Sequence, residues 1–346
     1  FTPKHPAPVD DRKPEADRPA QVEVPHVDID GVAYSLGMVH NPEAASAFRA
    51  QQPAQWFGDT PAGKASLAGA PETVLLCNAA KQVLGAFIPV RNQGSVGSCV
   101  SFGVAAAIEH LMCVQIARGD MAEFRPLCQE AIYGLSRVEI GKGRVGRGDG
   151  SVGAWAAEAV KQYGVITRDK HDGYDLRVYN ETLCRQWGAK GLPDDLEPLA
   201  KESPVKGITG IRNAEEAKKA LLQGYPIAVC SNQGFNTTRD KDGFLKAQGQ
   251  WGHCMCVIGF TDGPRKGFLI LNSWGADWVK GPKGAHDIPD GCFWCEWNTF
   301  DRMCREEDTW AFSDAVGFPA RDPWFIQAKP LRREVVAVKL INSLAW

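Results

Sequence analysis

The fold is predicted from the stretch Gln93-Gly-Ser-Val-Gly-Ser-Cys99-Val-Ser-Phe-Gly-Val-Ala-Ala-Ala-Ile-Glu-His-Leu-Met-Cys-Val-Gln-Ile116. A polar loop of glycine and serine leads into Cys99, and apolar residues then recur at helical spacing. We therefore expect a buried helix that begins at Cys99. Unpaired backbone N–H groups and the positive end of the helix dipole favour a thiolate at such a position. Cys99 is thus a candidate nucleophile.

Gln93 precedes this cysteine by one short turn and is a candidate partner for it. Its side-chain amide and the backbone N–H of Cys99 would supply two hydrogen-bond donors to an oxyanion. Such donors are usually the largest single contribution to acyl-transfer catalysis.

Two later segments supply the base that a cysteine nucleophile needs. His253 begins the apolar run His253-Cys-Met-Cys-Val-Ile258, and a second apolar run, Phe268-Leu-Ile-Leu271, ends at Asn272. The two runs are close enough in sequence to pair as antiparallel strands, which would place Asn272 beside the ring of His253.

Together these motifs resemble those of the papain-like cysteine peptidases. Gln-Gly-x-x-Gly-Ser-Cys, Gly-His before an apolar strand, and Asn-Ser-Trp-Gly occur in the family's order, over roughly residues 71 to 312. The order Cys, His, Asn is that of the papain variant of the catalytic triad. The resemblance implies that Cys99 is the nucleophile, His253 the general base and acid, and Asn272 the residue that orients the imidazole. It also implies that Gln93 is an oxyanion donor and that Trp274 and Trp278 support the active site.

The chain departs from the family beside the nucleophile. Val96 and Val100 stand where the family usually has cysteine and an aromatic residue. The usual disulfide beside the active site therefore cannot form. Neither change touches a proton-transfer group.

The expected architecture is an α+β papain-like fold, with a helical half, a β-barrel half and a cleft between them. We assign residues 71–312 to the peptidase domain, with the helical half at about 92–210 and the β half at about 211–312 plus 71–91. Residues 1–70 are expected to be an extended proline-rich arm and connector, and residues 313–346 a C-terminal extension. The family's inhibitory prosegment has a helical motif that residues 1–70 lack, so a tether is the favoured interpretation of the arm.

Several local elements are also expected. Residues 124–140 have helical periodicity, and Asn213 with Glu216 forms a capping-box pattern at a helix start. Residues 170–207 are polar and are expected to be insertion and connector. The tripeptide Arg147-Gly-Asp149 resembles an adhesion motif, but it is too short to support an inference.

Substrate contacts are expected at a glycine-rich loop and at two cysteines. In the family, the backbone of a loop just before a helix pairs with the substrate as an added strand, and Gly150 and Ser151 match it best. A flexible surface turn is the alternative. By resemblance, Cys230 and Cys254 lie near the pocket for the side chain second from the scissile bond, with ordinary core packing as the alternative.

Composition limits the other classes of function. The formal charge of −2 argues against nucleic acid or an anionic membrane as the main partner. The chain has no run of about 18 apolar residues, so we expect no membrane span. Eleven cysteines, an odd number, include no recognisable family disulfide, which favours a reducing or mixed compartment. The pairs Cys254-x-Cys256 and Cys292-x-x-Cys295 could bind zinc, but packing as small hydrophobic residues is preferred, and we expect no metal and no cofactor.

The predicted function is hydrolysis of peptide bonds by a cysteine-type endopeptidase through an acyl-enzyme. The alternative is a papain-fold structural or binding subunit, tethered in a larger assembly by its terminal arms. Transglutaminase-like acyl transfer would normally have Asp in place of Asn272. The expected partners are a peptide or protein substrate and a protein that binds the terminal segments.

Overall fold

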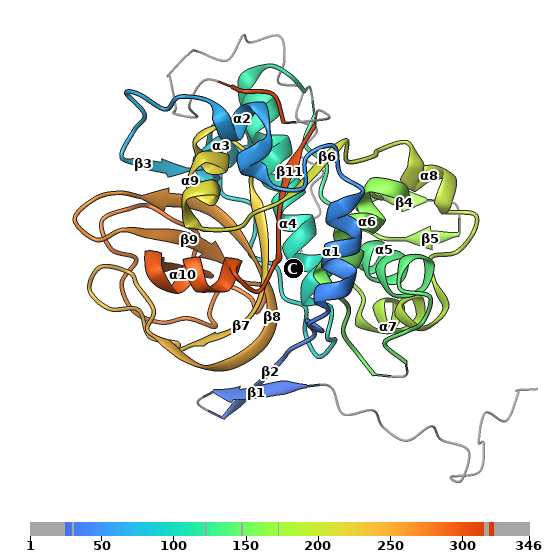
Figure 1. The fold of residues 1–346 in the computed structure, drawn as a ribbon. Helices are drawn as coiled ribbons and strands as arrows, with labels where there is room; N and C mark the ends of the chain where they lie inside the picture. Colours follow the sequence, from blue (N-terminus) through green and yellow to red (C-terminus); the bar gives the residue numbers. More distant parts are fainter. Residues whose placement is uncertain are drawn as a thin grey trace, which may run out of the picture.

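A computed structural model of the chain describes residues 25–29, 31–121, 123–146, 148–171, 173–314 and 318–321. A β half and a helical half lie side by side, and helix α4 (Cys99–Arg118) lies between them (Figure 1). The expected α+β architecture, with a helical half beside a β half, is confirmed.

The β half is built on an antiparallel sheet. Its strands follow the order β10-β9-β8-β7-β11-β6, and β3 pairs with β8. The strands are β3 (Thr73–Leu75), β6 (Gly207–Gly210), β7 (Ile227–Phe235), β8 (Ala247–Thr261), β9 (Gly267–Leu271), β10 (Cys292–Glu296) and β11 (Asp308–Ser313). Strands β8 and β9 are neighbours, as their sequences predict.

Most helices of the other half follow α4 in sequence. They are α5 (Gln129–Gly134), which continues as the π-helical turn η3 (Leu135–Ile140), then α6 (Gly153–Gln162), α7 (Glu181–Lys190) and α8 (Glu197–Lys201). A short hairpin of β4 (Lys170–His171) and β5 (Tyr174–Asp175) precedes α7. Helices α3 (Cys77–Leu84), α9 (Ala214–Leu222) and α10 (Trp297–Cys304) lie on the other side of α4, with the sheet (Figure 1).

Helix α4 begins at Cys99 as predicted and is buried on almost every side. Its buried carboxylate, Glu109, accepts hydrogen bonds from Arg91 Nη2 at 3.0 Å and from the Leu127 amide at 2.8 Å. Among the described residues, α4 is the single helix long and apolar enough to cross a membrane, and 94% of its most apolar window is buried inside the protein. That burial is what a core helix requires.

Two expectations for the helical half are wrong in part. The helix predicted at 124–140 begins only at Gln129, because the backbone before it is extended and Leu127 bridges to Thr167. The connector predicted at 170–207 contains α7 and α8. Asn180 caps α7 by accepting a hydrogen bond from the Leu183 amide. Trp187, on the apolar side of α7, is buried. The Asn213 cap of α9 is confirmed.

Part of the expected N-terminal arm is folded against the body. Residues 42–64 contain α1 (Pro42–Ala50), η2 (Phe57–Asp59) and α2 (Pro61–Lys64). Phe48 packs against Trp310, and Phe57 is fully buried. The prediction of an extended connector is therefore wrong for this stretch. Residues 1–24 and 30 lie outside the described part of the chain.

A hairpin of β1 (His26–Ile29) and β2 (Val32–Ser35) precedes α1 and projects from the body (Figure 1). Of the expected C-terminal extension, residues 318–321 are described beyond β11. There, Phe318 packs against Phe57 and Tyr225, with ring centroids 5.7 and 5.1 Å apart. The expected element at 332–341 lies outside the described residues.

Candidate active site

His253 lies on β8, and Asn272 directly follows the neighbouring strand β9, so the two side chains meet. The His253 Nε2 and Asn272 Oδ1 atoms are 2.7 Å apart, which confirms the predicted pairing. Trp274 lies over the imidazole, with ring centroids 4.6 Å apart. Within the described residues, the buried His253 Nδ1 has no hydrogen-bond partner. This nitrogen is therefore available to accept a proton.

Cys99 is buried at the start of α4, which packs against β8. Burial raises the pKa of its thiol, although hydrogen bonding from backbone that includes Gly37 opposes the shift. Burial also lowers the pKa of His253 to about 4, against the opposing effect of Asn272. Near pH 7 both groups are therefore neutral in this closed site. The thiolate expected at the helix start is not favoured here, because burial outweighs the helix dipole.

Gln93 is buried and its side chain is fully engaged. Its Nε2 donates to the carbonyl oxygens of Ser35 at 3.1 Å and Val96 at 2.9 Å. Its Oε1 accepts a hydrogen bond of 2.7 Å from Ser273 Oγ. The amide expected to hold an oxyanion therefore holds a carbonyl of the chain's own N-terminal segment.

That segment, residues 34–39, crosses the site, and we call it the strap. At one end Tyr34 stacks on Trp274, with ring centroids 4.8 Å apart. The Ser35 carbonyl, already bound by Gln93, accepts a second hydrogen bond from Trp274 Nε1 at 3.2 Å. The strap thus covers the indole that lies over the His253 ring.

Further along, the strap lies between β8 and the loop that precedes α6. The amides of Gly37 and Met38 donate to the Gly252 carbonyl at 3.1 and 2.9 Å. On the other side, the Ser151 amide donates to the Gly37 carbonyl at 2.8 Å, and the Val39 amide donates to the Ser151 carbonyl at 2.9 Å. Met38 and Ser151 therefore pair as a parallel β-bridge. A peptide lies where the sequence predicted that a substrate would pair.

Gly37 is the point of closest approach between the strap and the loop before Cys99. A Cβ atom on Gly37 would lie 2.0 Å from the carbonyl oxygen and 2.7 Å from the Cα of Gly97. Both are backbone atoms, so no side-chain rotation could make room. The strap fits this deeply because residue 37 has no side chain.

The remaining predicted residues lie around this centre. Gly150 contacts the strap, since a Cβ there would lie 2.8 Å from the Gly37 carbonyl oxygen. Cys230 and Cys254 face each other across β7 and β8 and are buried. Trp278 packs against Trp274 at 5.3 Å between ring centroids. The substrate-binding role of Gly150, Ser151, Cys230 and Cys254 stays a prediction.

The strap was not predicted from the sequence. It is bound mainly through its backbone, and backbone contacts leave no residue pattern. A glycine between Leu36 and Met38 was the one available signal, because glycine permits close backbone approach.

No group of three or more His, Cys, Asp or Glu side chains that could hold a metal occurs among the residues whose placement is described. All eleven cysteines are buried free thiols.

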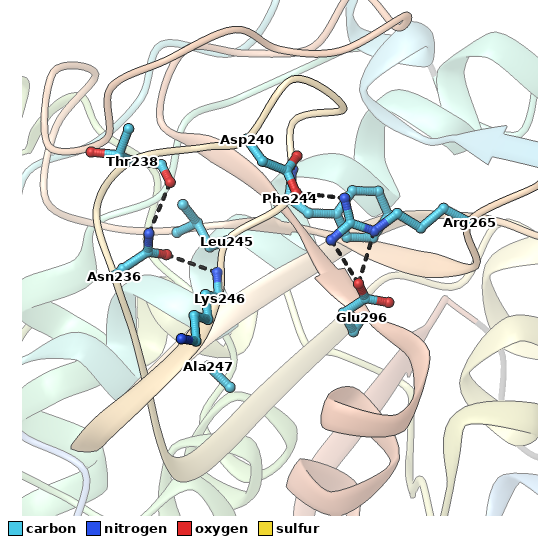
Figure 2. Close-up of a pocket in the computed structure, with 9 residues that line it drawn as sticks. All are labelled: Asn236, Thr238, Asp240, Phe244, Leu245, Lys246, Ala247, Arg265 and Glu296. Carbon is cyan, nitrogen blue, oxygen red and sulfur yellow. Dashed lines mark hydrogen bonds and ion pairs between the residues drawn. The ribbon is translucent and has the colours of Figure 1, made fainter.

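The β half carries a separate open pocket of about 190 Å³, which no predicted site residue lines. Figure 2 shows Arg265 reaching across it toward Asp240 and Glu296. The guanidinium also lies over the Phe244 ring, 3.9 Å from its centroid. Because these charges already pair with one another, this pocket is not the candidate site.

Comparison with known proteins assigns the family. Residues 77–295 match the model of the papain family of cysteine proteases. The chain is 27% identical over 205 residues to the probable cysteine protease RDL3 of Arabidopsis thaliana, covering 57% of this chain and 49% of the relative. It is 28% identical over 199 residues to caricain of Carica papaya, and this match covers 56% of this chain and 50% of the relative. The chain thus spans about half the length of these curated relatives.

A solved structure of xylellain, a cysteine protease from Xylella fastidiosa, has a similar fold. The TM-score is 0.52 at 19% sequence identity, and the match covers 72% of this chain and 88% of that one. The structural match supports the fold, and the sequence match covers more than half of the chain. The chain therefore belongs to the papain family of cysteine proteases.

Proposed function

We propose that this chain is a cysteine endopeptidase whose cleft is closed by its own strap. The observation that carries the proposal is a peptide already bound across the site. Its Ser35 carbonyl is held by Gln93, and its backbone pairs with Gly252 and Ser151. A groove that binds one extended peptide by backbone hydrogen bonds is suited to bind another.

In the proposed mechanism the strap must first leave. Water then reaches the site, so the pKa of Cys99 falls, that of His253 rises, and the proton moves from sulfur to imidazole. The thiolate attacks the substrate carbonyl carbon, while Gln93 and the Cys99 amide hold the oxyanion. The imidazolium protonates the leaving amine, and water then hydrolyses the acyl-enzyme. Asn272 orients the ring throughout.

The strap itself is proposed to resist cleavage. The Gly37 amide lies near the Cys99 sulfur, and an amide N–H is a hydrogen-bond donor and cannot be attacked. In addition, the closed site favours the neutral thiol, which is not the nucleophilic form.

Selective alkylation tests the proposal. In a Gly37→Ala variant with a loosened strap, iodoacetamide is expected to label Cys99 much faster than the other ten cysteines, which are buried. Peptide mapping by mass spectrometry would identify the labelled residue, and hydrolysis of a fluorogenic peptide would be measured in parallel. Equal labelling of many cysteines, or fast labelling of Cys99 without hydrolysis, would favour the alternative of a papain-fold binding subunit.

Replacing Asn272 with alanine in that same variant is expected to lower kcat by about 10- to 100-fold. A hydrogen bond to a charged group contributes about 1.5–3 kcal/mol, and this one would be lost in the imidazolium form. Steady-state kinetics measures the change. Asn236→Ala, the same substitution in the separate pocket of the β half, should leave kcat unchanged. Equal losses in the two variants would show that Asn272 acts through stability alone.

A further inference from the structure

Two loops that flank the strap are joined by a polar network. One is the loop of residues 93–98 before Cys99, and the other, residues 148–151, we call the rim. Asp149 Oδ2 accepts hydrogen bonds from the Gly97 amide at 3.2 Å and from Arg185 Nη1 at 2.6 Å. Arg185 Nη2 in turn donates to Ser95 Oγ at 3.1 Å. One carboxylate and one guanidinium therefore connect both loops to α7.

Arg137 organises the rim from beneath. Its guanidinium is buried and donates to the carbonyl oxygens of Gly148 at 2.6 Å, Gly188 at 2.7 Å and Gly150. The Gly150 amide donates in turn to Tyr133 Oη at 2.8 Å. These bonds occupy the rim's inward-facing backbone groups. The amide and carbonyl of the next residue, Ser151, are hydrogen-bonded to the strap.

A loop this rich in glycine needs such support. Glycine loses more conformational freedom on ordering than any other residue, so an unsupported rim would be mobile. A planar guanidinium presents five N–H donors in a fixed geometry and can meet several carbonyls at once. The lysine ammonium, a single point charge on a flexible stem, cannot replace it.

We propose that Arg137 and Asp149 are positioning residues for peptide binding. They hold the backbone of Ser151 where an extended peptide can pair with it, and they fix its distance from the loop that carries Gly97. This inference rests on the proposed function for substrates, but it applies equally to the strap. The hydrogen bonds of Asp149 and Arg185 join the rim to the loop before Cys99, where Val96 leaves no cysteine for a disulfide.

Arg137→Lys is expected to change a different quantity in each of two backgrounds. In the otherwise unchanged full chain, a loosened rim weakens the strap, so alkylation of Cys99 by iodoacetamide should accelerate about 10-fold. In the Gly37→Ala background, alkylation should stay within about twofold, because this small reagent needs no rim, while KM for a peptide substrate should rise about 10-fold. Both estimates assume the loss of one charged hydrogen bond.

Two further variants make the test decisive. Asp149→Asn keeps the shape of a half-buried side chain and should show the same pair of effects even if Arg137→Lys folds poorly. Arg144→Lys is the matched control, since Arg144 contacts the carbonyls of Ile140 and Gly141, away from the rim. Its kinetics should be unchanged.

The possible outcomes distinguish failure of the positioning role from failure of the proposed function. Unchanged alkylation and KM in both rim variants would overturn the positioning role, as would losses in every readout that follow the melting temperature. Absence of hydrolysis in the Gly37→Ala chain with Arg137 intact would instead count against the proposed function. The alkylation rate of the otherwise unchanged full chain would still decide whether Arg137 and Asp149 position the rim.

Discussion

Gly37→Ala is expected to raise peptide hydrolysis and Cys99 alkylation about 10- to 100-fold. The new methyl group would lie 2.0 Å from the Gly97 carbonyl oxygen. Overpacking of this kind costs about 1–3 kcal/mol, and each 1.4 kcal/mol corresponds to a tenfold change in the closed-to-open ratio. The loop cannot yield easily, because the Gly97 amide is bound by Asp149. The strap is the part that must move.

The measurement compares initial rates of a fluorogenic peptide and of iodoacetamide labelling in the two full-length chains. Gly263→Ala, in the loop between β8 and β9, is the matched control, since the nearest atom to the new Cβ is the flexible end of the Glu72 side chain, 3.0 Å away. Its rates should equal those of the parent chain. If Gly37→Ala also leaves both rates unchanged while the protein stays folded, the strap does not close the site.

Cys99→Ala, made in the Gly37→Ala background, is expected to reduce peptide hydrolysis by about 10⁴-fold or more, the order of loss seen when a triad nucleophile is removed. Without the sulfur no acyl-enzyme can form. The fold should persist, because alanine is tolerated at the start of a helix and removes a single buried atom. Hydrolysis rates and a thermal melt of the same samples measure the two expectations.

Cys113→Ala in the same background is the matched control. Cys113 lies further along α4 and is also fully buried, so the packing change is comparable. Its hydrolysis rate should remain close to that of the background chain. Residual activity of the Cys99 variant within about tenfold of the background would remove the proposed nucleophile.

The residues of the candidate site could be singled out from the sequence because they lie in local patterns. Cys99 begins an apolar helical run, His253 lies on β8, and Asn272 directly follows β9, the next strand in the sequence and the neighbour of β8. Local periodicity and short-range pairing determine such placements. The hydrogen bond between His253 and Asn272 followed from those two facts.

The strap and its supports could not be predicted in this way. Residues 34–39 reach the site across more than 50 residues of sequence, and backbone carbonyls and amides make most of their contacts. In the sequence, Arg137 is one polar position within a predicted helix. Its contacts depend on how the glycine-rich loop that follows this helix folds over it. Such contacts depend on tertiary structure that no local pattern encodes.

The anchoring of the segment after the strap determines how the protein would open. Helix α1 is fixed to the body by Phe48 against Trp310 and by an ion pair of 2.8 Å between Arg49 and Glu307. The strap is therefore a tethered ligand, present at an effective concentration that for short tethers is in the millimolar range. Dilution cannot release it. Because the strap is part of the chain, its opening is an intramolecular event whose rate is independent of protein concentration. Under the proposed function, every incoming peptide would have to compete with it.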